Sequence, residues 1–437
     1  MLQRFIRNSA GGVAPMFAIA AIPLIGAIGA AIDYSRAASV RTQLLAAADA
    51  ASLASVRKSS AAMTAAASMN SDGPITDGAT EATKIFGAEI TGAKGYTLNS
   101  VTADVKKTGS NIASTVKFSA QVPMSFMGLF GFSSVTIGGS STAANNMPLF
   151  IDFYLLLDNT PSMGVGATTS DITTMVNNTP DKCAFACHDK SDSNNYYNLA
   201  KSLGVTTRID VLRSATQQLM DTAKSTATFS NQFRMAIYTF GAAAEKPGLT
   251  KIQSLTKNLS TAKTSAGAID LMTVPYQNYA GDTDTNFPDV LDKMKDEIPK
   301  PGDGSKSSKA LKYLFFVSDG VGDRVNGSPG CARPVTNSSD PETGKSYTRC
   351  QEPLDPSWCE DIKKNNVKIA VLYTTYLPLP TNAWYNSWIK PFESQIASNM
   401  QSCASSGLYF EVGPNQGISE AMNALFQKAI AMARLTK

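Results

Sequence analysis

The sequence contains a single histidine, His188, among 437 residues, and this scarcity removes support for several kinds of chemistry. A Ser-His-Asp triad needs an imidazole beside its nucleophile, whereas His188 lies in the cysteine-containing segment "CAFACH". The C-x-x-x-C-H spacing of that segment is one residue too long for haem attachment, and zinc would need a further ligand from elsewhere. A Ser–Lys arrangement stays open but has no motif behind it. The sequence therefore gives no positive indication of an enzyme.

Charged residues are also scarce, at 17% of the chain against roughly 25% in an average soluble protein. The 39 basic and 35 acidic residues give a net charge of +4 and form no basic block. Without a basic stripe, a nucleic-acid partner has no electrostatic support. The abundance of Ala, Ser, Thr and Asn suits a protein that works outside the cytoplasm.

Cysteine is absent from the first 182 residues, and the even count of six beyond that point predicts up to three disulfides in an exported protein. We expect a local bridge in "CAFACH", a bridge that staples a later insertion, and a bridge between two helices that each precede a strand. The corresponding candidates are Cys183 with Cys187, Cys331 with Cys350, and Cys359 with Cys403.

The N-terminal segment Gly11–Ile32 carries no charged residue. At about 1.5 Å per helical residue, this segment can cross a bilayer core of about 30 Å. Two arginines lie on each side of this segment, so the positive-inside rule is nearly balanced. The positive charge of the free amine before the segment and the negative charge of Asp33 after it favour a cytoplasmic N-terminus. We therefore expect residues 1–35 to form a short cytoplasmic stub and a transmembrane anchor. A cleaved signal peptide, cut near Gly29–Ala31, is the alternative.

Residues 36–147 are predicted to form a helix laid against a small antiparallel sheet. An apolar stripe at helical spacing runs through Val40, Leu44, Ala47, Ala51 and Ala54. A loop is expected over residues 59–78, followed by a short helix over 79–90. From about residue 96 the hydrophobic period changes to two, which is typical of half-buried strands.

Residues 148–437 show apolar runs that alternate with helical segments, which predicts an α/β fold: a doubly wound, mainly parallel sheet covered on both faces. The expected strands are "LFIDFYLLLD", "FRMAIYTF", "LKYLFFVSD", "VKIAVLYT" and a weaker "GLYFEV". Insertions interrupt the alternation at about 164–206 and 320–357.

Two of these apolar strands end in aspartate, Asp158 and Asp319, and ligands of such sheets collect at the carboxyl ends of strands. Asp158, Thr160 and Ser162 stand at alternate positions of a tight loop, and a third polar cluster, "GDTDTN", precedes a predicted helix. Carboxylates and hydroxyls are the ligands of hard divalent cations, so we expect a metal site. The alternative is that Thr160 or Ser162 caps the next helix and Asp319 begins a turn.

The segment "DNTPSM" resembles the D-x-S/T-x-S motif of von Willebrand factor A domains, which opens their metal-ion-dependent adhesion site. "FFVSDG" and "GDTDT" similarly resemble the later elements of that site. The resemblance implies a divalent ion, Mg²⁺ in the first place, with Mn²⁺ or Ca²⁺ as alternatives. It implies the ligands Asp158, Thr160, Ser162, Thr283 and Asp319, with Thr285 able to replace Thr283. It also implies a domain that binds, through an acidic side chain of its partner, and does not catalyse.

The N-terminal third, "NSAGGVAPMFAIAAIPLIGAIGAAIDYSRA" followed by "LLAAADAASLA", resembles the anchor of TadE/TadG-like proteins of tight-adherence (Flp) pilus assembly. The whole chain thus resembles the TadG type. The resemblance implies a single-pass protein of the bacterial inner membrane, with a periplasmic body that binds another pilus or envelope protein. The alternative is a cell-surface adhesin that binds an external ligand through the same site.

Overall fold

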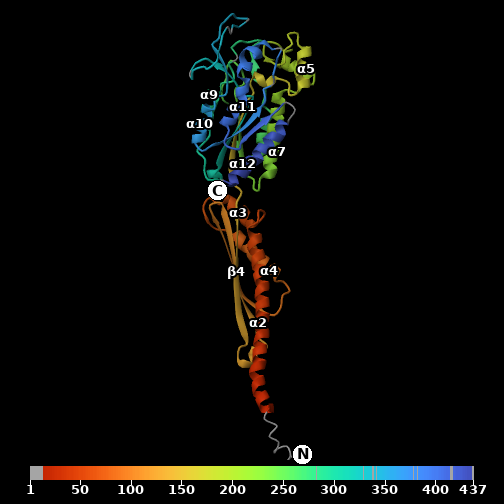
Figure 1. Cartoon of the computed structure of the whole chain (residues 1–437), viewed down its shortest axis with the longest axis vertical. Coiled ribbons are helices and arrows are strands. Elements are labelled where there is room, and N and C mark those ends of the chain that lie inside the picture. Colours follow the sequence, from red (N-terminus) through yellow and green to blue (C-terminus); the bar gives the residue numbers. More distant parts are fainter. Residues whose placement is uncertain are drawn as a thin grey trace, which may run out of the picture. The chain divides into compact units, whose positions relative to one another are not determined.

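The structure is a computed structural model of the full chain, and it describes residues 13–281, 283–327, 329–336, 339–340, 342–376, 378–380, 382–413 and 417–435. The two arginines of the expected cytoplasmic stub lie outside these residues. The chain separates into two compact units, Met1–Met147 (unit 1) and Pro148–Lys437 (unit 2). Figure 1 labels the main elements of both units.

Unit 1 is built on one uninterrupted helix, α2 (Val13–Ser55), which continues from the apolar segment into the packed part of the unit. A four-stranded antiparallel sheet lies against its second half, in the order β1-β2-β3-β4. The predicted stripe is buried except for its last residue, the half-buried Ala54, and Leu44 and Ala51 are fully enclosed in a core with Val116 and Phe86. The remaining elements are α3 (Ala61–Ser68), β1 (Gly73–Pro74), α4 (Thr76–Glu89), β2 (Thr97–Thr108), β3 (Asn111–Pro123), η2 (Met127–Phe130) and β4 (Ser134–Asn146).

The loop expected over residues 59–78 is wrong in part, because Ala61–Ser68 forms the helix α3. Ser60 caps its first turn, accepting a hydrogen bond from the backbone N–H of Met63 at 3.1 Å. The buried Lys107 ammonium donates to the carbonyls of Ala66 and Met69 at the other end of α3. A run of alanines has high helix propensity, and both ends of this short helix find polar partners.

Unit 2 contains a six-stranded sheet in the order β15-β14-β10-β5-β7-β8. Neighbouring strands pair in parallel from β15 to β7, whereas the edge strand β8 runs antiparallel to β7. The predicted α/β architecture with a long apolar N-terminal helix is confirmed, and the sheet is mixed. The strands are β5 (Ile151–Leu157), β7 (Phe233–Thr239), β8 (Thr250–Thr256), β10 (Leu311–Ser318), β14 (Lys368–Thr374) and β15 (Tyr409–Val412).

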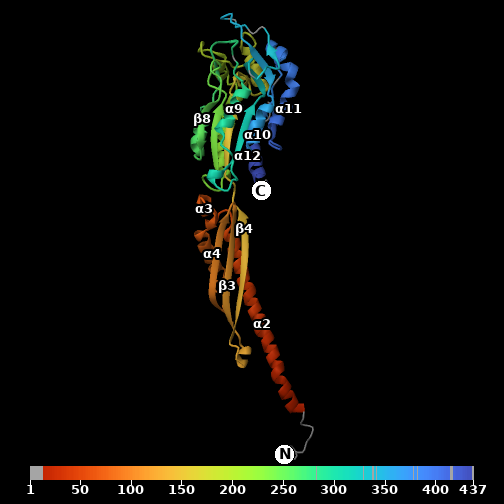
Figure 2. The ribbon, with the colours of Figure 1, turned by 90° about the vertical axis from the view of Figure 1, so that its left-hand side faces the viewer.

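Helices cover both faces of this sheet, as Figures 1 and 2 show. Alternate residues of β5 enter opposite cores, with Phe153 and Leu155 in one and Tyr154 and Leu156 in the other. Helices α7 (Arg208–Thr226), α8 (Leu259–Ala266) and α12 (Ile418–Leu435) supply the first core. Helices α9 (Phe287–Glu297), α10 (Ser357–Lys364) and α11 (Glu393–Cys403) supply the second.

The two predicted insertions carry short elements of their own. Between β5 and α7 lie η3 (Pro161–Gly164), α5 (Thr169–Asn178), β6 (His188–Asp189) and α6 (Tyr196–Ser202). Between β10 and α10 lie β11 (Val321–Val325), β12 (Pro334–Val335) and β13 (Arg349–Pro353), which form a three-stranded antiparallel sheet. The other short elements are β9 (Thr273–Val274), η4 (Ser307–Lys309), η5 (Tyr385–Ile389) and η6 (Lys390–Phe392).

Candidate metal centre

The central strands β5 and β10 bring two aspartates to one edge of the sheet. These strands pair in parallel with Leu157 opposite Val317, so the residues that follow both strands emerge at the same edge. The backbone N–H of Asp158 donates to the carbonyl of Val317 at 2.9 Å. The side chains of Asp158 and Asp319 have no solvent exposure, so the pair of carboxyl groups predicted from the strand ends is buried.

The Asp158 carboxylate is held by donors of its own loop and by the hydroxyl at the end of β10. The backbone N–H and the hydroxyl of Thr160 donate to its Oδ1 at 3.0 and 2.7 Å, and the Ser318 hydroxyl donates to its Oδ2 at 2.6 Å. The hydroxyls of Thr160 and Ser162 lie 3.3 Å apart. Three of the predicted ligands, Asp158, Thr160 and Ser162, therefore belong to one hydrogen-bonded group.

The alternative role of Thr160 as a helix cap finds no support in this loop. Thr160 precedes η3, but its side chain makes no capping hydrogen bond there. The next α-helix, α5, is capped by Thr168, whose hydroxyl accepts from the N–H of Asp171 at 3.1 Å. The hydroxyl of Thr160 is thus directed to Asp158 and not to a helix end.

Asp319 has an incomplete set of partners. Its Oδ1 accepts from the N–H of Val321 at 3.1 Å, whereas its Oδ2 is buried and accepts no hydrogen bond from the described residues. The nearest cation is Arg208, whose Nη1 lies 3.9 Å from that oxygen. An unsatisfied buried carboxylate oxygen is costly, so an additional positive partner at this oxygen would stabilise the site.

The electrostatics of the pair follow from this burial. Burial, and then the neighbouring charge of Asp158, raise the pKa of Asp319 to about 7, against the opposing influence of Arg208, the nearby Ser162 hydroxyl and the Val321 N–H. Burial also raises the pKa of Asp158, although the hydroxyls of Ser318 and Thr160 oppose it. A divalent cation would neutralise both carboxylates at once, and the residues present therefore fit a hard metal ion.

The third predicted loop is buried, and its hydrogen bonds do not decide between Thr283 and Thr285 as the metal ligand. Thr283 and Thr285 are 8% and 3% exposed. Thr285 exchanges backbone hydrogen bonds with Asp323 at 2.9 and 3.0 Å, which ties this loop to β11. Ser162 and Thr285 line a common cavity of about 560 Å³, whereas Thr283 is not among its lining residues. Thr283 stays a prediction, and the cavity favours the alternative, Thr285.

Sequence reasoning missed Ser318 and Arg208. Ser318 ends β10, where it appears in the sequence as one more residue of an apolar strand. Arg208 begins α7, and its Nη2 donates to the carbonyl of Thr375 at 2.9 Å. The capping box between Thr207 and Asp210 could have located the start of α7. It could not have shown that the side chain of Arg208 reaches Asp319.

Two other buried acids of this region, Asp323 and Glu352, are paired with arginine. The Arg349 guanidinium forms a two-pronged ion pair with Asp323, with Nε donating to Oδ1 at 3.1 Å. Arg324 pairs with Glu352, with Nε donating to Oε1 at 2.8 Å. These two acids are compensated, which distinguishes them from Asp319.

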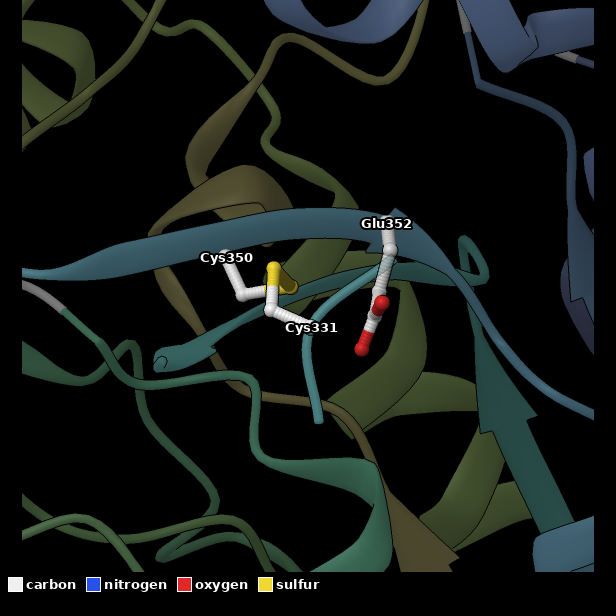
Figure 3. A group of neighbouring side chains, drawn as sticks. All are labelled: Cys331, Cys350 and Glu352. Atoms are coloured by element: carbon white, nitrogen blue, oxygen red, sulfur yellow. A yellow bond between two sulfur atoms is a disulfide. The ribbon is translucent and has the colours of Figure 1, made fainter. Parts of the chain in front are cut away.

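Glu352 also lies beside Cys331 and Cys350, and the three side chains are close enough to suggest a metal site (Figure 3). The two sulfurs, however, are joined in a disulfide. Disulfide sulfurs are not thiolates and do not serve as metal ligands in the way that cysteinate does. This group is therefore a structural staple and not a second metal centre.

Two of the three expected disulfides are present. Cys331 is bonded to Cys350, and Cys359 is bonded to Cys403. Cys183 and Cys187 carry thiols in this structure, and a hydrogen bond with Cys187 lowers the pKa of Cys183. The bridge between those two cysteines stays a prediction.

The single histidine has a structural environment. His188 Nδ1 lies 3.1 Å from the carbonyl oxygen of Leu271, and its ring packs against that of Tyr197 at 4.7 Å between centroids. Neither contact involves the aspartate pair.

Comparisons with known proteins give a family match for the N-terminal segment and only weak structural similarity for the chain. No curated protein sequence matches the chain. Several solved structures show weak similarity. The von Willebrand factor domain of the type V pili tip protein Mfa5 from Porphyromonas gingivalis is 10% identical, with a TM-score of 0.35 and coverage of 65% of this chain and 96% of that one.

The three N-terminal domains of Mfa5 from the same organism are 9% identical, with a TM-score of 0.34 and coverage of 69% and 49% of the two chains. Proximal thread matrix protein 1 from the mussel byssus is 11% identical, with a TM-score of 0.30 and coverage of 65% and 46%. This chain thus matches about half the length of those two structures.

The apolar helix and the family comparison agree on the N-terminus. Among the described residues, α2 is the one helix long and apolar enough to cross a membrane, with a mean hydropathy of 2.1 in its most apolar part. Residues 11–67 match the family model of putative Flp pilus-assembly TadE/G-like proteins. This confirms the resemblance predicted from the sequence: residues 11–67 of the chain are similar to TadE/G-like proteins of Flp pilus assembly.

Proposed function

We propose that this chain is a membrane-anchored, periplasm-facing protein of pilus assembly or pilus anchoring, and that unit 2 binds a protein partner through a divalent metal ion. The TadE/G-like segment supports the pilus-related role, and α2 supports the membrane anchor. The proposed fold of unit 2 is that of a von Willebrand factor A domain, with its doubly wound sheet and the ion at the edge where β5 and β10 end.

One observation carries the metal proposal: Asp319 Oδ2 is buried and lacks a hydrogen-bond donor among the described residues, beside a second buried carboxylate. Asp158 would hold the ion mainly through water, because both of its oxygens already accept hydrogen bonds. The hydroxyls of Thr160 and Ser162 and one threonine of the third loop complete the proposed set. Asp323 and Glu352, two other buried acids of this region, are paired with arginines.

A hard cation bound there, Mg²⁺ above all, supplies a positive centre to which an acidic side chain of the partner can bind. Ser162 belongs both to the aspartate group and to the lining of the 560 Å³ cavity, so the proposed centre has access to that cavity. We propose binding without turnover, since the aspartate group contains no imidazole and His188 is directed to a backbone carbonyl.

The metal proposal is tested by titrating Mg²⁺ or Mn²⁺ into the full chain in detergent and measuring binding by calorimetry. Asp158→Asn keeps the size of the side chain and removes its charge. Asp296→Asn makes the same change at an exposed position of α9 and serves as the control. We expect binding by the unchanged chain and by the control, and its loss in Asp158→Asn. Equal binding by all three chains would refute the site.

The partner proposal is tested by crosslinking in the native cell, with the same two variants. We expect one envelope or pilus protein to lose its crosslink with Asp158→Asn alone. A cell-surface adhesin is the competing function. External protease should digest unit 2 of an adhesin on intact cells, whereas a periplasmic unit should become accessible only after the outer envelope is opened.

A further inference from the structure

The loop between β3 and β4 exposes large apolar side chains in an uncharged part of the chain. No charged residue lies between Lys117 and Asp152. Within the loop Met124–Ser133, the exposed fractions are 84% for Leu129, 61% for Phe132 and 50% for Phe130. Apolar side chains that gather on a surface in this way mark a contact with an apolar partner. Figure 2 shows the turn of the β3–β4 hairpin that carries this loop.

The backbone of the loop is fixed to α2 through a single buried carboxylate. Asp33 accepts hydrogen bonds from the N–H groups of Ser125, Phe126 and Met127 at 3.0, 2.9 and 2.8 Å. Asp33 itself is 3% exposed. Backbone N–H groups that enter an apolar medium must find acceptors within the protein. The Asp33 carboxylate is the acceptor for three of these groups.

The side chains of the loop pack on the apolar part of α2 before Asp33. A Cβ atom on Gly29 would lie 2.5 Å from the Cβ of Phe126, and one on Gly26 would lie 3.1 Å from Cζ of Phe130. Gly29 is buried, in contrast to most of its neighbours along the apolar segment. The loop therefore occupies the same level as the last two turns of the expected membrane span.

The remaining surface of α2 at that level is apolar and uncovered. Ile22, Ile25, Ile28 and Ile32 are 64%, 60%, 56% and 48% exposed. If this surface meets lipid, the loop beside it meets the same lipid, because the two apolar surfaces are continuous.

We propose that the loop Met124–Ser133 inserts into the lipid bilayer beside the anchor helix, as a second membrane contact of unit 1. The inference rests on the proposed membrane anchor. Gly26, which faces Phe130 of the loop, precedes the end of the expected membrane span at Ile32 by six residues, or about 9 Å along a helix. This distance is close to the depth of about 5–10 Å at which interfacial segments bury their apolar faces. We assign the bilayer as the partner of this surface because its side chains are apolar and because three backbone N–H groups of the loop already donate to Asp33. Neither feature carries a cost in hydrocarbon.

Photo-crosslinking of the full chain in vesicles of phosphatidylethanolamine and phosphatidylglycerol tests the insertion. A diazirine amino acid is placed singly at Leu129, at Ile19 in the anchor, or at Thr108, an exposed residue of β2 at the opposite end of the sheet. Leu129 is 84% exposed, so its replacement removes little packing. We expect lipid adducts at Ile19 and at Leu129, and only the background level of adducts at Thr108.

The outcomes separate the loop from the anchor. Lipid adducts at Ile19 without adducts at Leu129 would overturn the insertion and leave the anchor standing. Absence of adducts at both positions would overturn both. Adducts at Leu129 to a second copy of the chain, in place of lipid, would assign the surface to self-association and also overturn the proposal.

Discussion

Replacing Asp319 by asparagine should stabilise unit 2 in the absence of metal and should abolish its stabilisation by metal. The carboxyl group is fully buried, and its pKa rises from an ordinary value of 3.8 to about 7 because of burial and of Asp158. In the metal-free protein, the folded state therefore holds a proton that the unfolded state releases between pH 3.8 and about 7. Stability is fully present below that window and is lost as the pH rises through it.

The size of the effect follows from the width of this window. At about 1.4 kcal/mol per pH unit, ionising Asp319 costs about 4 kcal/mol of folding free energy at pH 8. Asparagine has nearly the same shape, can still accept from the N–H of Val321, and carries no charge. In EDTA at pH 8, Asp319→Asn should thus be more stable than the unchanged chain by as much as a few kcal/mol.

Urea unfolding followed by tryptophan fluorescence measures this difference selectively. All three tryptophans of the chain, Trp358, Trp384 and Trp388, belong to unit 2. The gain should disappear below about pH 4, where both chains are neutral at this position. With Mg²⁺ at a hundred times its Kd, the unchanged chain should gain about 2.7 kcal/mol and the variant nothing. Asp296→Asn should respond to neither condition.

Two results would refute this reasoning. If Asp319→Asn is destabilised in EDTA at pH 8, the buried carboxylate is compensated better than its missing hydrogen bond implies. If Mg²⁺ stabilises the variant as much as the unchanged chain, Asp319 is not part of a metal centre.

Three further predictions concern unit 2. Arg208→Met removes the cation 3.9 Å from Asp319 Oδ2, so its urea midpoint should rise more on addition of Mg²⁺ than that of the unchanged chain, and an equal rise would contradict this. Phe153→Ala should lower the free energy of unfolding by about 3–5 kcal/mol, measured in urea, because the ring is 1% exposed in the core. Replacing both Cys359 and Cys403 by alanine should lower it by as much as about 4 kcal/mol, since their bridge spans 44 residues. An unchanged midpoint in either case would show that the reasoning fails.

Much of the site could be predicted because two apolar strands each end at an aspartate, a change that is visible in the sequence. Asp158 and Asp319 each follow a run of buried residues, and parallel pairing of β5 with β10 then places them at one edge. Long apolar runs determine strands strongly, since both faces of the central sheet are covered. The position of Arg208 was beyond prediction, because the direction of a long side chain depends on the packing of α7 against neighbouring loops.

The antiparallel edge strand β8 was also missed. Its sequence, "TKIQSLT", has a half-exposed pattern of polar and apolar residues and lacks a long apolar run. Edge strands bury less surface and carry polar side chains, so their sequences differ little from those of loops. The short helix α3 was missed for a related reason: Ser, Asn, Asp and Gly surround its alanines and indicate a loop.

The continuity of α2 has a consequence for the rotation of the anchor about its own axis. Successive residues of a helix are turned by about 100°, so the number of residues between the apolar segment and the buried stripe fixes their angular phase. The packing of Leu44 and Ala51 against the sheet therefore determines which side of the anchor Gly26 and Gly29 occupy. Inserting a single residue after Asp33 would turn these glycines by about 100° away from the β3–β4 loop, whereas inserting eleven would restore their direction to within about 20°.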